Sequence, residues 1–269
     1  LYEFFQRVEL TRADYQELFA LARELHLPLF STPFDEESLD LLVELGVPAV
    51  KVASPDLTHR PFLSQVARTG LPVVLSTGMG TESEIARALE TLRKAGNDDL
   101  LLLHCVSNYP ARYEEMNLAC LPVLESRFQV PVGLSDHTPD TLAAVVAASL
   151  GAVMIEKHFT LDRTLPGPDQ AMSLEPQDLK ALKESTGKVR TLLGRGVKTV
   201  QPSERAVQLG ARRSLVARVD LEPGTILTED RIAIKRPGTG IPPEDLDRVV
   251  GRRVTSRISA EELLDWEKL

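Results

Sequence analysis

The stretch that decides the fold of this chain is Val130-Pro-Val-Gly-Leu-Ser-Asp-His137, together with the later run Ala152-Val-Met-Ile-Glu-Lys-His158. Both runs are apolar until their last few residues, and continuous apolar runs are typical of parallel strands that are buried on both faces. A stretch of helical character separates them. The two runs and their connection therefore predict one strand–helix–strand unit of a parallel sheet.

Four earlier runs have the same character, and a helical stretch follows each of them. They are residues 27–32, 49–54, 72–77 and 100–105. The six runs start roughly 20 to 30 residues apart, which is the span of one strand–helix unit. No Gly-x-Gly-x-x-Gly turn is present, so a Rossmann sheet fits poorly. The pattern favours an α/β fold, a (β/α)8 TIM barrel whose first two β/α units are absent from this chain, which begins with Leu1 rather than Met.

Helix-start signals follow several of these runs. Thr81-x-x-Glu84 is a capping box, and Thr138-Pro139 places a proline at an expected first helical position. The polar residues that end the runs therefore collect at the carboxyl ends of the strands. In parallel α/β folds this rim carries the active site.

A second, smaller domain is expected after the last amphipathic helix. Gly194-Arg-Gly196 and Gln201-Pro-Ser-Glu204 interrupt the chain, and short β-like segments follow them. We predict a partial barrel over residues 1–197, a linker over 198–208 and a small β-rich domain over 209–269.

Composition excludes several classes of function. The chain has 269 residues and a formal net charge of -8, and its acidic balance argues against nucleic acid as a partner. The longest nearly apolar stretch, residues 142–155, is too short to span a bilayer, so no membrane partner is expected. Two cysteines, Cys105 and Cys120, cannot form a disulfide framework, which predicts a reducing, cytoplasmic setting.

Two histidines stand just past strand ends, His137 and His158. If their strands are neighbours, the two imidazoles converge on one rim, where they suit a divalent ion such as Mn, Fe or Zn with open water positions. The alternative is that each histidine only caps a loop. His104, inside a run, is expected to be a core histidine with a satisfied ring.

Two lysines, Lys51 and Lys157, sit within apolar runs, where a lysine is costly unless an anion or a carboxylate meets it. Hydroxyls and backbone N–H groups near Lys51 would complete a cradle for a phosphate or carboxylate. The cradle residues are Ser54, Ser76, Thr77, Gly78 and Ser135. A structural salt bridge from Lys51 to Glu156 or Asp56 is the alternative.

At these residues the chain resembles the sialic acid synthase family, which includes legionaminic and pseudaminic acid synthases and spore coat polysaccharide synthesis proteins. The resemblance covers essentially the whole chain and rests on seven motifs and a tail. They are Phe30-Ser-Thr-Pro-Phe-Asp35, Lys51-Val-Ala-Ser54, Leu75-Ser-Thr-Gly-Met79, His104-Cys-Val-Ser-Asn-Tyr-Pro110, Leu134-Ser-Asp-His137, Ile155-Glu-Lys-His-Phe-Thr160 and Gly167-Pro-Asp169, with Lys235-Arg-Pro-Gly-Thr-Gly-Ile241 in the tail. That tail is similar to the antifreeze-like (SAF) domain.

The resemblance implies a transferase that condenses phosphoenolpyruvate with an N-acylated aldose to a nine-carbon 2-keto-3-deoxy acid and releases phosphate. His137 and His158 would hold a divalent metal, most simply Mn²⁺. Phosphoenolpyruvate would be held by Thr32, Lys51, Ser54, Ser76 and Ser135, with Thr77, Gly78 and Lys157 beside them. Tyr109, Asp169 and Asp56 would face the sugar, and Arg236 would reach the barrel of a partner subunit in a domain-exchanged homodimer.

Departures from the family pattern leave the acceptor sugar open. Many members have Ser-Gly-Glu where this chain has Ser54-Pro55-Asp56, and an Asn where it has Val106. N-acetylmannosamine and a 2,4-diacetamido-trideoxyhexose both remain candidates. The opening strands of the family, which carry Ala-Glu-Ile-Gly and Lys-Phe-Gln, do not appear here. A non-catalytic carbohydrate-binding or dimerisation module is therefore an alternative, and an aldolase that uses free pyruvate is a weaker one.

Overall fold

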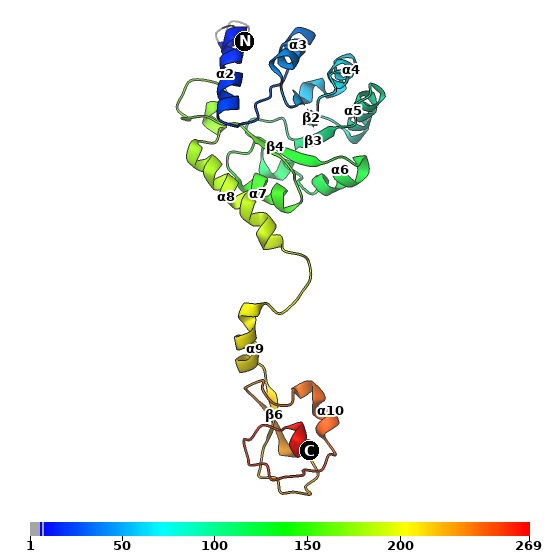
Figure 1. The fold of residues 1–269 in the computed structure, drawn as a ribbon, viewed down its shortest axis with the longest axis vertical. Coiled ribbons are helices and arrows are strands. Elements are labelled where there is room, and N and C mark those ends of the chain that lie inside the picture. The colour runs from blue at the N-terminus through cyan, green and yellow to red at the C-terminus, as the bar shows by residue number, and fades with distance from the viewer. Residues whose placement is uncertain (1–5, 7) are drawn as a thin grey trace. The chain divides into compact units, whose positions relative to one another are not determined.

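The computed structural model describes residue 6 and residues 8–269, and the chain divides into two compact units (Figure 1). The first unit is Leu1–Arg195 and the second is Gly196–Leu269. The expected linker, residues 198–208, falls within the second unit, where it holds the short 3-10 helix η4 (Pro202–Glu204) and the start of a helix.

A five-stranded parallel sheet forms the centre of the first unit, with the strands in sequence order. The strands are β1 (Val50–Val52), β2 (Val73–Ser76), β3 (Leu100–Cys105), β4 (Val132–Asp136) and β5 (Ile155–Lys157). The sheet is curled into a half-barrel, so the fold predicted from the apolar runs is confirmed for these strands. On β4 and β5 the register pairs Ser135 with Glu156, which brings the polar ends of the two strands together.

Helices cover the outer face of this sheet (Figure 1). They are α3 (Glu36–Leu45), α4 (Arg60–Arg68), α5 (Glu82–Lys94), α6 (Cys120–Phe128), α7 (Leu142–Ser149) and α8 (Pro176–Leu193), and α2 (Arg12–Glu24) precedes them. Short 3-10 helices are η1 (Ser54–Thr58), η2 (Tyr113–Glu115) and η3 (Gln170–Met172). Alternate strand residues such as Val52, Leu102 and Leu134 are fully buried in one core with the helices. The residues between them face the inside of the half-barrel, because side chains alternate along a strand.

The first apolar run, residues 27–32, is not a strand. It lies alongside β1 and makes one ladder hydrogen bond, from the Lys51 amide to the Ser31 carbonyl at 3.2 Å. Pro28 and Pro33 lack the N–H that further ladder bonds would need. The prediction of a strand here is therefore wrong, although the segment runs extended at the edge of the sheet.

The two helix-start predictions had different outcomes. The capping box at the start of α5 is present, with Thr81 and Glu84 each accepting a hydrogen bond from the other's backbone N–H. The predicted start at Pro139 is wrong, because α7 begins at Leu142. The carbonyls of Thr138 and Asp140 accept hydrogen bonds from a lysine of β5, so this segment is held as a loop before the helix starts.

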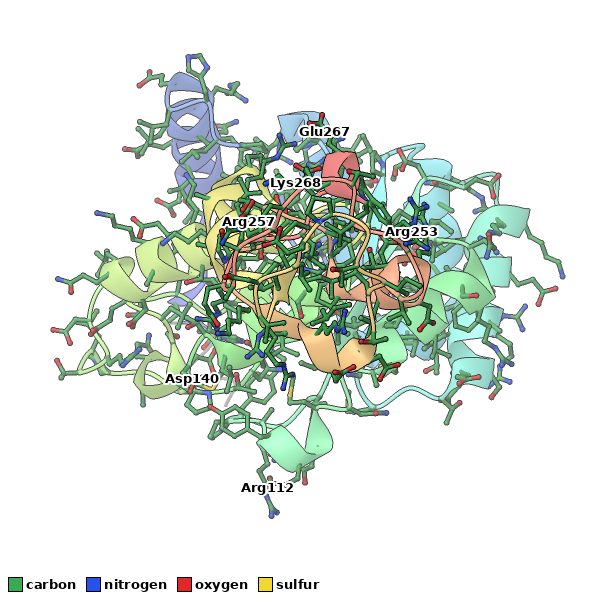
Figure 2. All side chains as sticks on the ribbon, turned by 90° about the horizontal axis from the view of Figure 1, so that it is seen from below. Arg112, Asp140, Arg253, Arg257, Glu267 and Lys268 are labelled. Atoms are coloured by element: carbon green, nitrogen blue, oxygen red, sulfur yellow. The ribbon has the colours of Figure 1, made fainter. Side chains whose placement is uncertain are left out.

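The second unit is small and has its own core. It contains β6 (Ser214–Ala217) and β7 (Ile232–Lys235), which pair antiparallel, the helices α9 (Arg205–Ala211) and α10 (Leu246–Val249), and the 3-10 helices η5 (Glu229–Arg231), η6 (Pro243–Asp245) and η7 (Trp266–Lys268). Leu215, Leu227 and Ile258 are fully buried in that core. Arg253 and Arg257 lie among its charged side chains (Figure 2); Arg257 forms ion pairs with two carboxylates, and Arg253 donates to the Gly224 carbonyl.

Across the residues that the structure describes, no helix combines the length and the apolar character needed to cross a membrane.

Candidate active site

Functional side chains gather on the inner face of β4 and β5, at their carboxyl ends. Ser135 and His137 face inward from the end of β4, and Glu156 and His158 face inward from β5, since alternate residues share a face. The Ser135 hydroxyl donates to Glu156 Oε1 at 2.6 Å, and the two imidazole ring centres are 5.3 Å apart. The structure therefore brings together the two histidines that the sequence placed on neighbouring strands.

His137 is oriented by the loop after β3. Its Nδ1 lies 2.9 Å from the Val106 carbonyl, and since a carbonyl can only accept, Nδ1 carries the proton and Nε2 keeps its lone pair. The Tyr109 ring lies 4.2 Å from the His137 ring, and burial raises the pKa of the Tyr109 hydroxyl. Burial opposes the charged form of His137, but hydrogen bonds with Cys105 and the Val106 carbonyl outweigh it and raise the His137 pKa.

His158 is half-buried beside Asp169, with Nδ1 3.5 Å from the carboxylate Oδ2. Burial is the main cause that lowers the pKa of His158; the Asp169 carboxylate opposes this shift, and the neighbouring His137 adds to it. A neutral imidazole is the form that binds metals. Metal-binding histidines commonly have a carboxylate or a backbone carbonyl beside the ring nitrogen that does not bind the metal. Here the Asp169 carboxylate lies beside His158, and the Val106 carbonyl lies beside His137.

These donors fit a divalent metal held by two protein ligands. In neutral His137 the Nε2 atom is the ring nitrogen left for a metal, because Nδ1 bonds to the Val106 carbonyl, and the His158 ring centre lies 5.3 Å from that of His137. Among the residues that the structure describes, no group of three or more His, Cys, Asp or Glu side chains is arranged as a metal cage. Such a two-histidine site leaves coordination positions for water and substrate oxygen, which suits Mn²⁺ better than a closed structural site.

Polar groups from β1 and β2 line the neighbouring part of the inner face. Lys51 is 7% exposed, and its ammonium lies 3.4 Å from Glu156 Oε2. The Gly78 amide donates to Ser54 Oγ at 3.0 Å. Ser76 Oγ is buried and has no hydrogen-bond partner within the described part of the chain. A buried hydroxyl without a partner, on the strand beside the one that carries a buried ammonium, is an arrangement that an anion would complete.

Gly78 is required by the close packing of this cradle. A Cβ atom at Gly78 would lie 2.2 Å from Ser107 Oγ, 2.8 Å from Ser54 Oγ and 3.0 Å from Cys105 Sγ. Thr77, the residue before it, donates from its hydroxyl to the Leu103 carbonyl and is occupied there. Because residue 78 is a glycine, its backbone N–H can approach the Ser54 hydroxyl within the cradle.

Of the two salt bridges considered for Lys51, the structure shows the one with Glu156. Asp56 instead lies 3.5 Å from the His59 ring, and its second oxygen is buried without a hydrogen-bond partner among the described residues. Thr32 is half-buried on the extended segment beside β1. Arg236 is exposed on the second unit.

Lys157 does not belong to the cradle. Its ammonium lies 3.2 Å from Asp136 Oδ2 and donates to the carbonyls of Thr138 at 2.5 Å and Asp140 at 2.9 Å, on the other side of the strand. Two of these contacts are hydrogen bonds to carbonyls and the third is an ion pair, since Asp136 Oδ2 has no hydrogen-bond partner among the described residues. The expectation that Lys157 points inward fails because adjacent residues of β5 alternate, and Glu156 holds the inward position.

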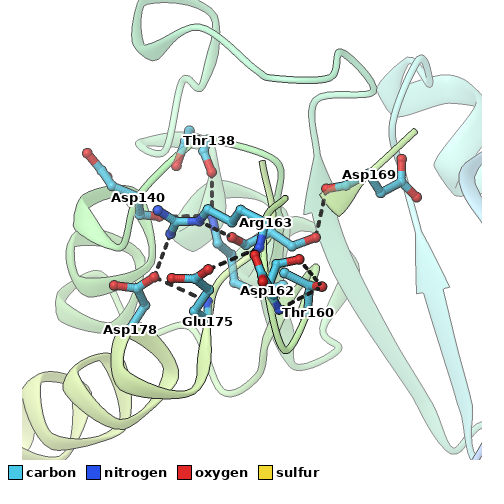
Figure 3. A network of polar contacts seen from close by, with 10 residues as sticks. Thr138, Asp140, Thr160, Asp162, Arg163, Asp169, Glu175 and Asp178 are labelled. Atoms are coloured by element: carbon cyan, nitrogen blue, oxygen red, sulfur yellow. Dashed lines mark hydrogen bonds and ion pairs between the residues drawn. The ribbon is translucent and has the colours of Figure 1, made fainter. Parts of the chain in front are cut away.

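A polar network supports the loop that carries Asp169 (Figure 3). The Arg163 guanidinium donates to the Ser173 carbonyl at 2.8 Å and to Asp178 at 2.5 Å, and the Arg163 amide donates to Glu175. These bonds tie the loop after β5 to the first turn of α8. They hold the segment on which Asp169 stands beside His158.

Three inward residues were not among the predicted site residues: Glu156, Cys105 and Ser107. Burial raises the pKa of the Cys105 thiol, but hydrogen bonds with His137 and Ser54 outweigh it and lower that pKa. Counting alternate positions back from His158 and from Ser107 would have placed Glu156 and Cys105 on the inner face. His104 faces the other way and its ring meets the Met116 carbonyl at 2.7 Å, as predicted for a satisfied core histidine.

Comparison with known proteins identifies relatives along the whole chain. The chain is 43% identical to an uncharacterized protein of Methanocaldococcus jannaschii over 100% of its own length and 80% of that protein. It is 40% identical to the N,N'-diacetyllegionaminic acid synthase of Legionella pneumophila, over 100% of this chain and 76% of that one. The crystal structure of an N-acetylneuraminic acid synthetase from Leptospira borgpetersenii, solved with citrate, matches 74% of this chain and 70% of that chain with 37% identity and a TM-score of 0.70.

Family models agree with these relatives and with the division of the chain. Residues 212–269 match the SAF domain, which the tail motif predicted. Residues 1–198 match the NeuB family, and this chain belongs to that family of sialic-acid-type synthases.

Proposed function

We propose that this protein condenses phosphoenolpyruvate with an N-acylated aldose to form a nine-carbon 2-keto-3-deoxy acid. The methylene carbon of phosphoenolpyruvate forms a bond to the aldehyde carbon of the open-chain sugar, whose oxygen takes up a proton. Water adds to C2 of the former phosphoenolpyruvate, and the C–O bond to phosphate breaks. One water is consumed and one inorganic phosphate is released, so the atoms balance.

The observation that carries the proposal is the shared inner face of the two histidines and the anion cradle. His137 and His158 lie at one end of this face, and Lys51 and Ser76 lie at the other, with Glu156 bound to both Lys51 and Ser135 between them. One substrate is an anion and the other is an aldehyde that must be polarised. The two halves of the face match these two needs.

Lys51, Ser54, Ser76 and Ser135 bind and orient phosphoenolpyruvate, and the Gly78 amide holds the Ser54 hydroxyl in place. Lys51 provides a positive charge in a site from which water is largely excluded, and such charge-assisted contacts are about twice as strong as neutral ones. Ser76 Oγ gains the hydrogen-bond partner that it lacks among the described residues. Holding the methylene carbon against the aldehyde is an orientation effect, which contributes several kcal/mol to such reactions.

His137 and His158 hold the metal, which we propose to be Mn²⁺. A divalent ion supplies Lewis-acid polarisation of a carbonyl oxygen. The protonated Nδ1 of His137 and the carboxylate beside His158 keep both rings in place. Asp169 is also the carboxylate placed to take the proton of the water that adds at C2.

The acceptor binds on the rim above the histidines. The Tyr109 ring lies over both imidazoles, 4.2 Å from one and 5.7 Å from the other, and is 52% exposed, so it can pack against a sugar. Asp56 has a buried oxygen without a hydrogen-bond partner among the described residues, which suits a sugar hydroxyl. Arg236 would contact the acylamino group from the SAF domain of a second subunit, in a domain-exchanged homodimer in the cytoplasm.

The named relatives support an acylamino sugar as the acceptor. The Legionella pneumophila relative is a synthase of N,N'-diacetyllegionaminic acid, and the match covers 100% of this chain. A 2,4-diacetamido-trideoxyhexose is therefore the first acceptor to test, ahead of N-acetylmannosamine.

The test is phosphate release from phosphoenolpyruvate by the purified protein with Mn²⁺ and each of the two sugars. We expect release that depends on the sugar and on the metal, with a 2-keto-3-deoxy acid as the second product. A chelator and the variant His137→Ala are the negative controls. Glu90→Gln, on the exposed surface of α5, is the matched positive control.

The contrary outcomes separate the alternatives. Product formation from free pyruvate, without phosphoenolpyruvate, would favour an aldolase. Sugar binding without any phosphate release, measured by calorimetry, would favour a non-catalytic carbohydrate-binding module. Either result would overturn the proposed reaction.

A further inference from the structure

A buried ion pair lies directly behind the two histidines. Asp136 precedes His137 on β4, and Lys157 precedes His158 on β5. The side chains of Asp136 and Lys157 are 0% and 5% exposed, and their charged atoms lie 3.2 Å apart. The pair therefore repeats, on the outer side of the strands, the juxtaposition that the histidines make on the inner side.

The same pair holds the loop that follows β4. Asp136 Oδ1 accepts from the Thr138 amide at 2.9 Å, and Lys157 donates to the carbonyls of Thr138 and Asp140. In the sequence, His137 lies between Asp136, which accepts this hydrogen bond, and Thr138, whose amide donates it. Both flanks of the His137 backbone are thus attached to the ion pair.

A third segment joins this arrangement. Asp140 accepts a hydrogen bond from the Tyr113 hydroxyl, and the Ala111 amide donates to the His137 carbonyl at 2.9 Å. The loop after β3, which carries Tyr109 over the imidazoles, is therefore fastened to the same few residues. Strands β4 and β5 and two rim loops all meet at the ion pair.

We propose that Asp136 and Lys157 are positioning residues that set the separation and orientation of His137 and His158 and so determine the affinity for the metal. This inference rests on the proposed function, because it assigns the two histidines to a metal. Lys157 is held by Asp136 and two backbone carbonyls, and both side chains are buried on the outer side of the strands, so neither touches substrate. Outer partners of metal ligands typically change metal affinity by about 10- to 100-fold when they are replaced.

The test is a titration with Mn²⁺ alone, followed by electron paramagnetic resonance, on the full chain. The main variant is Asp136→Asn/Lys157→Met. It removes both charges together, so no unpaired charge stays buried, and the asparagine oxygen can still accept from the Thr138 amide. We expect Mn²⁺ to bind about tenfold more weakly than to the unchanged protein, while Tm changes by only a few degrees.

Asp136→Asn alone is a milder second variant, because Lys157 keeps both carbonyl contacts. We expect its Mn²⁺ affinity to fall between those of the unchanged protein and the double variant. The matched control is Glu90→Gln/Lys94→Met, which removes an exposed ion pair on α5 and should leave both Tm and Mn²⁺ affinity unchanged. Amide hydrogen exchange of residues 138–140 should accelerate only in the variants of the buried pair.

Mn²⁺ affinity equal to that of the unchanged protein, in a double variant with a lowered Tm, would show a structural role only and overturn the inference. Absence of Mn²⁺ binding by the unchanged protein would instead contradict the metal role of the histidines in the proposed function. The two failures are therefore distinguishable.

Discussion

The inner face of the sheet and the layer behind it each contain a buried lysine, yet the two lysines are bound differently. Behind the sheet, Lys157 forms an ion pair with a fully buried carboxylate and donates to two carbonyls. On the inner face, Lys51 lies 3.4 Å from a carboxylate that is itself 39% exposed, and Ser76 Oγ, on the neighbouring strand, has no hydrogen-bond partner among the described residues. Two backbone contacts and a buried counter-charge indicate a structural lysine, whereas a lysine beside a partly exposed carboxylate indicates a place for a ligand.

The largest effect on stability should come from breaking the buried ion pair between Asp136 and Lys157. Lys157→Met leaves Asp136 charged and unpaired in the interior, and breaking a buried pair in this way costs about 3–5 kcal/mol. The same substitution at Lys51 should cost about 1 kcal/mol or less, because Glu156 remains in contact with water. Urea unfolding of the two variants measures the difference, and equal losses would contradict the comparison.

Removing a histidine from the inner face should have the next largest effect. His137→Ala and His158→Ala each take away one of two protein ligands for the metal, and we expect phosphate release to fall by about 10²–10³-fold. Stability should change little for the partly exposed His158 and fall more for His137, which is 6% exposed and bonded to the Val106 carbonyl. His104→Ala, on the outer side of β3, is the control: it should lower Tm while leaving bound Mn²⁺ in place.

Lys51→Met should act mainly on phosphoenolpyruvate. Losing one partner of a desolvated charged contact costs about 2 kcal/mol or more, which is roughly 30-fold in KM for this substrate. The KM for the sugar should stay within about threefold, since the cradle and the acceptor rim are separate parts of the face. Initial rates with each substrate varied in turn provide the measurement; equal changes in both constants would place Lys51 elsewhere.

The smallest effect should come from Ser76→Ala, and it should have opposite signs in two assays. Because the buried hydroxyl has no partner in the described structure, its removal should raise the free energy of unfolding by about 1 kcal/mol. The same change should raise the KM for phosphoenolpyruvate by about three- to tenfold, since the hydroxyl no longer binds the anion. Ser135→Ala, whose hydroxyl is already bound to Glu156, should lower stability instead. Loss of stability in both variants would contradict the proposed anion site.

Much of the site could be predicted from the sequence because its residues end apolar strands. His137, His158 and Ser135 follow this pattern, Lys51 lies inside its run, and the structure places all four on one face. The error at Lys157 has a simple physical origin. A position at the end of a strand does not determine which face of the sheet the side chain takes. Because Glu156 faces inward and adjacent residues alternate, Lys157 faces outward.

The edges of the sheet were harder to predict for another reason. Residues 27–32 have the composition of a strand, but ladder hydrogen bonds need N–H groups that Pro28 and Pro33 do not have. The start of α7 was misplaced because distant residues decide it. Lys157 takes the carbonyls of Thr138 and Asp140, and nothing near Pro139 in the sequence announces this.

The sequence by itself determined the alternation of strands and helices, the second small domain and the types of side chain available for chemistry. These features depend on local periodicity and on caps, which are properties of neighbouring residues. Only the tertiary structure decided that Lys51 faces the inner side of the sheet and Lys157 the outer side. It also decided that Glu156 contacts both Lys51 and Ser135, and that the Asp136–Lys157 ion pair lies behind the histidines. Those contacts depend on strand register and on the side that each residue faces, and register is set by packing across the whole sheet.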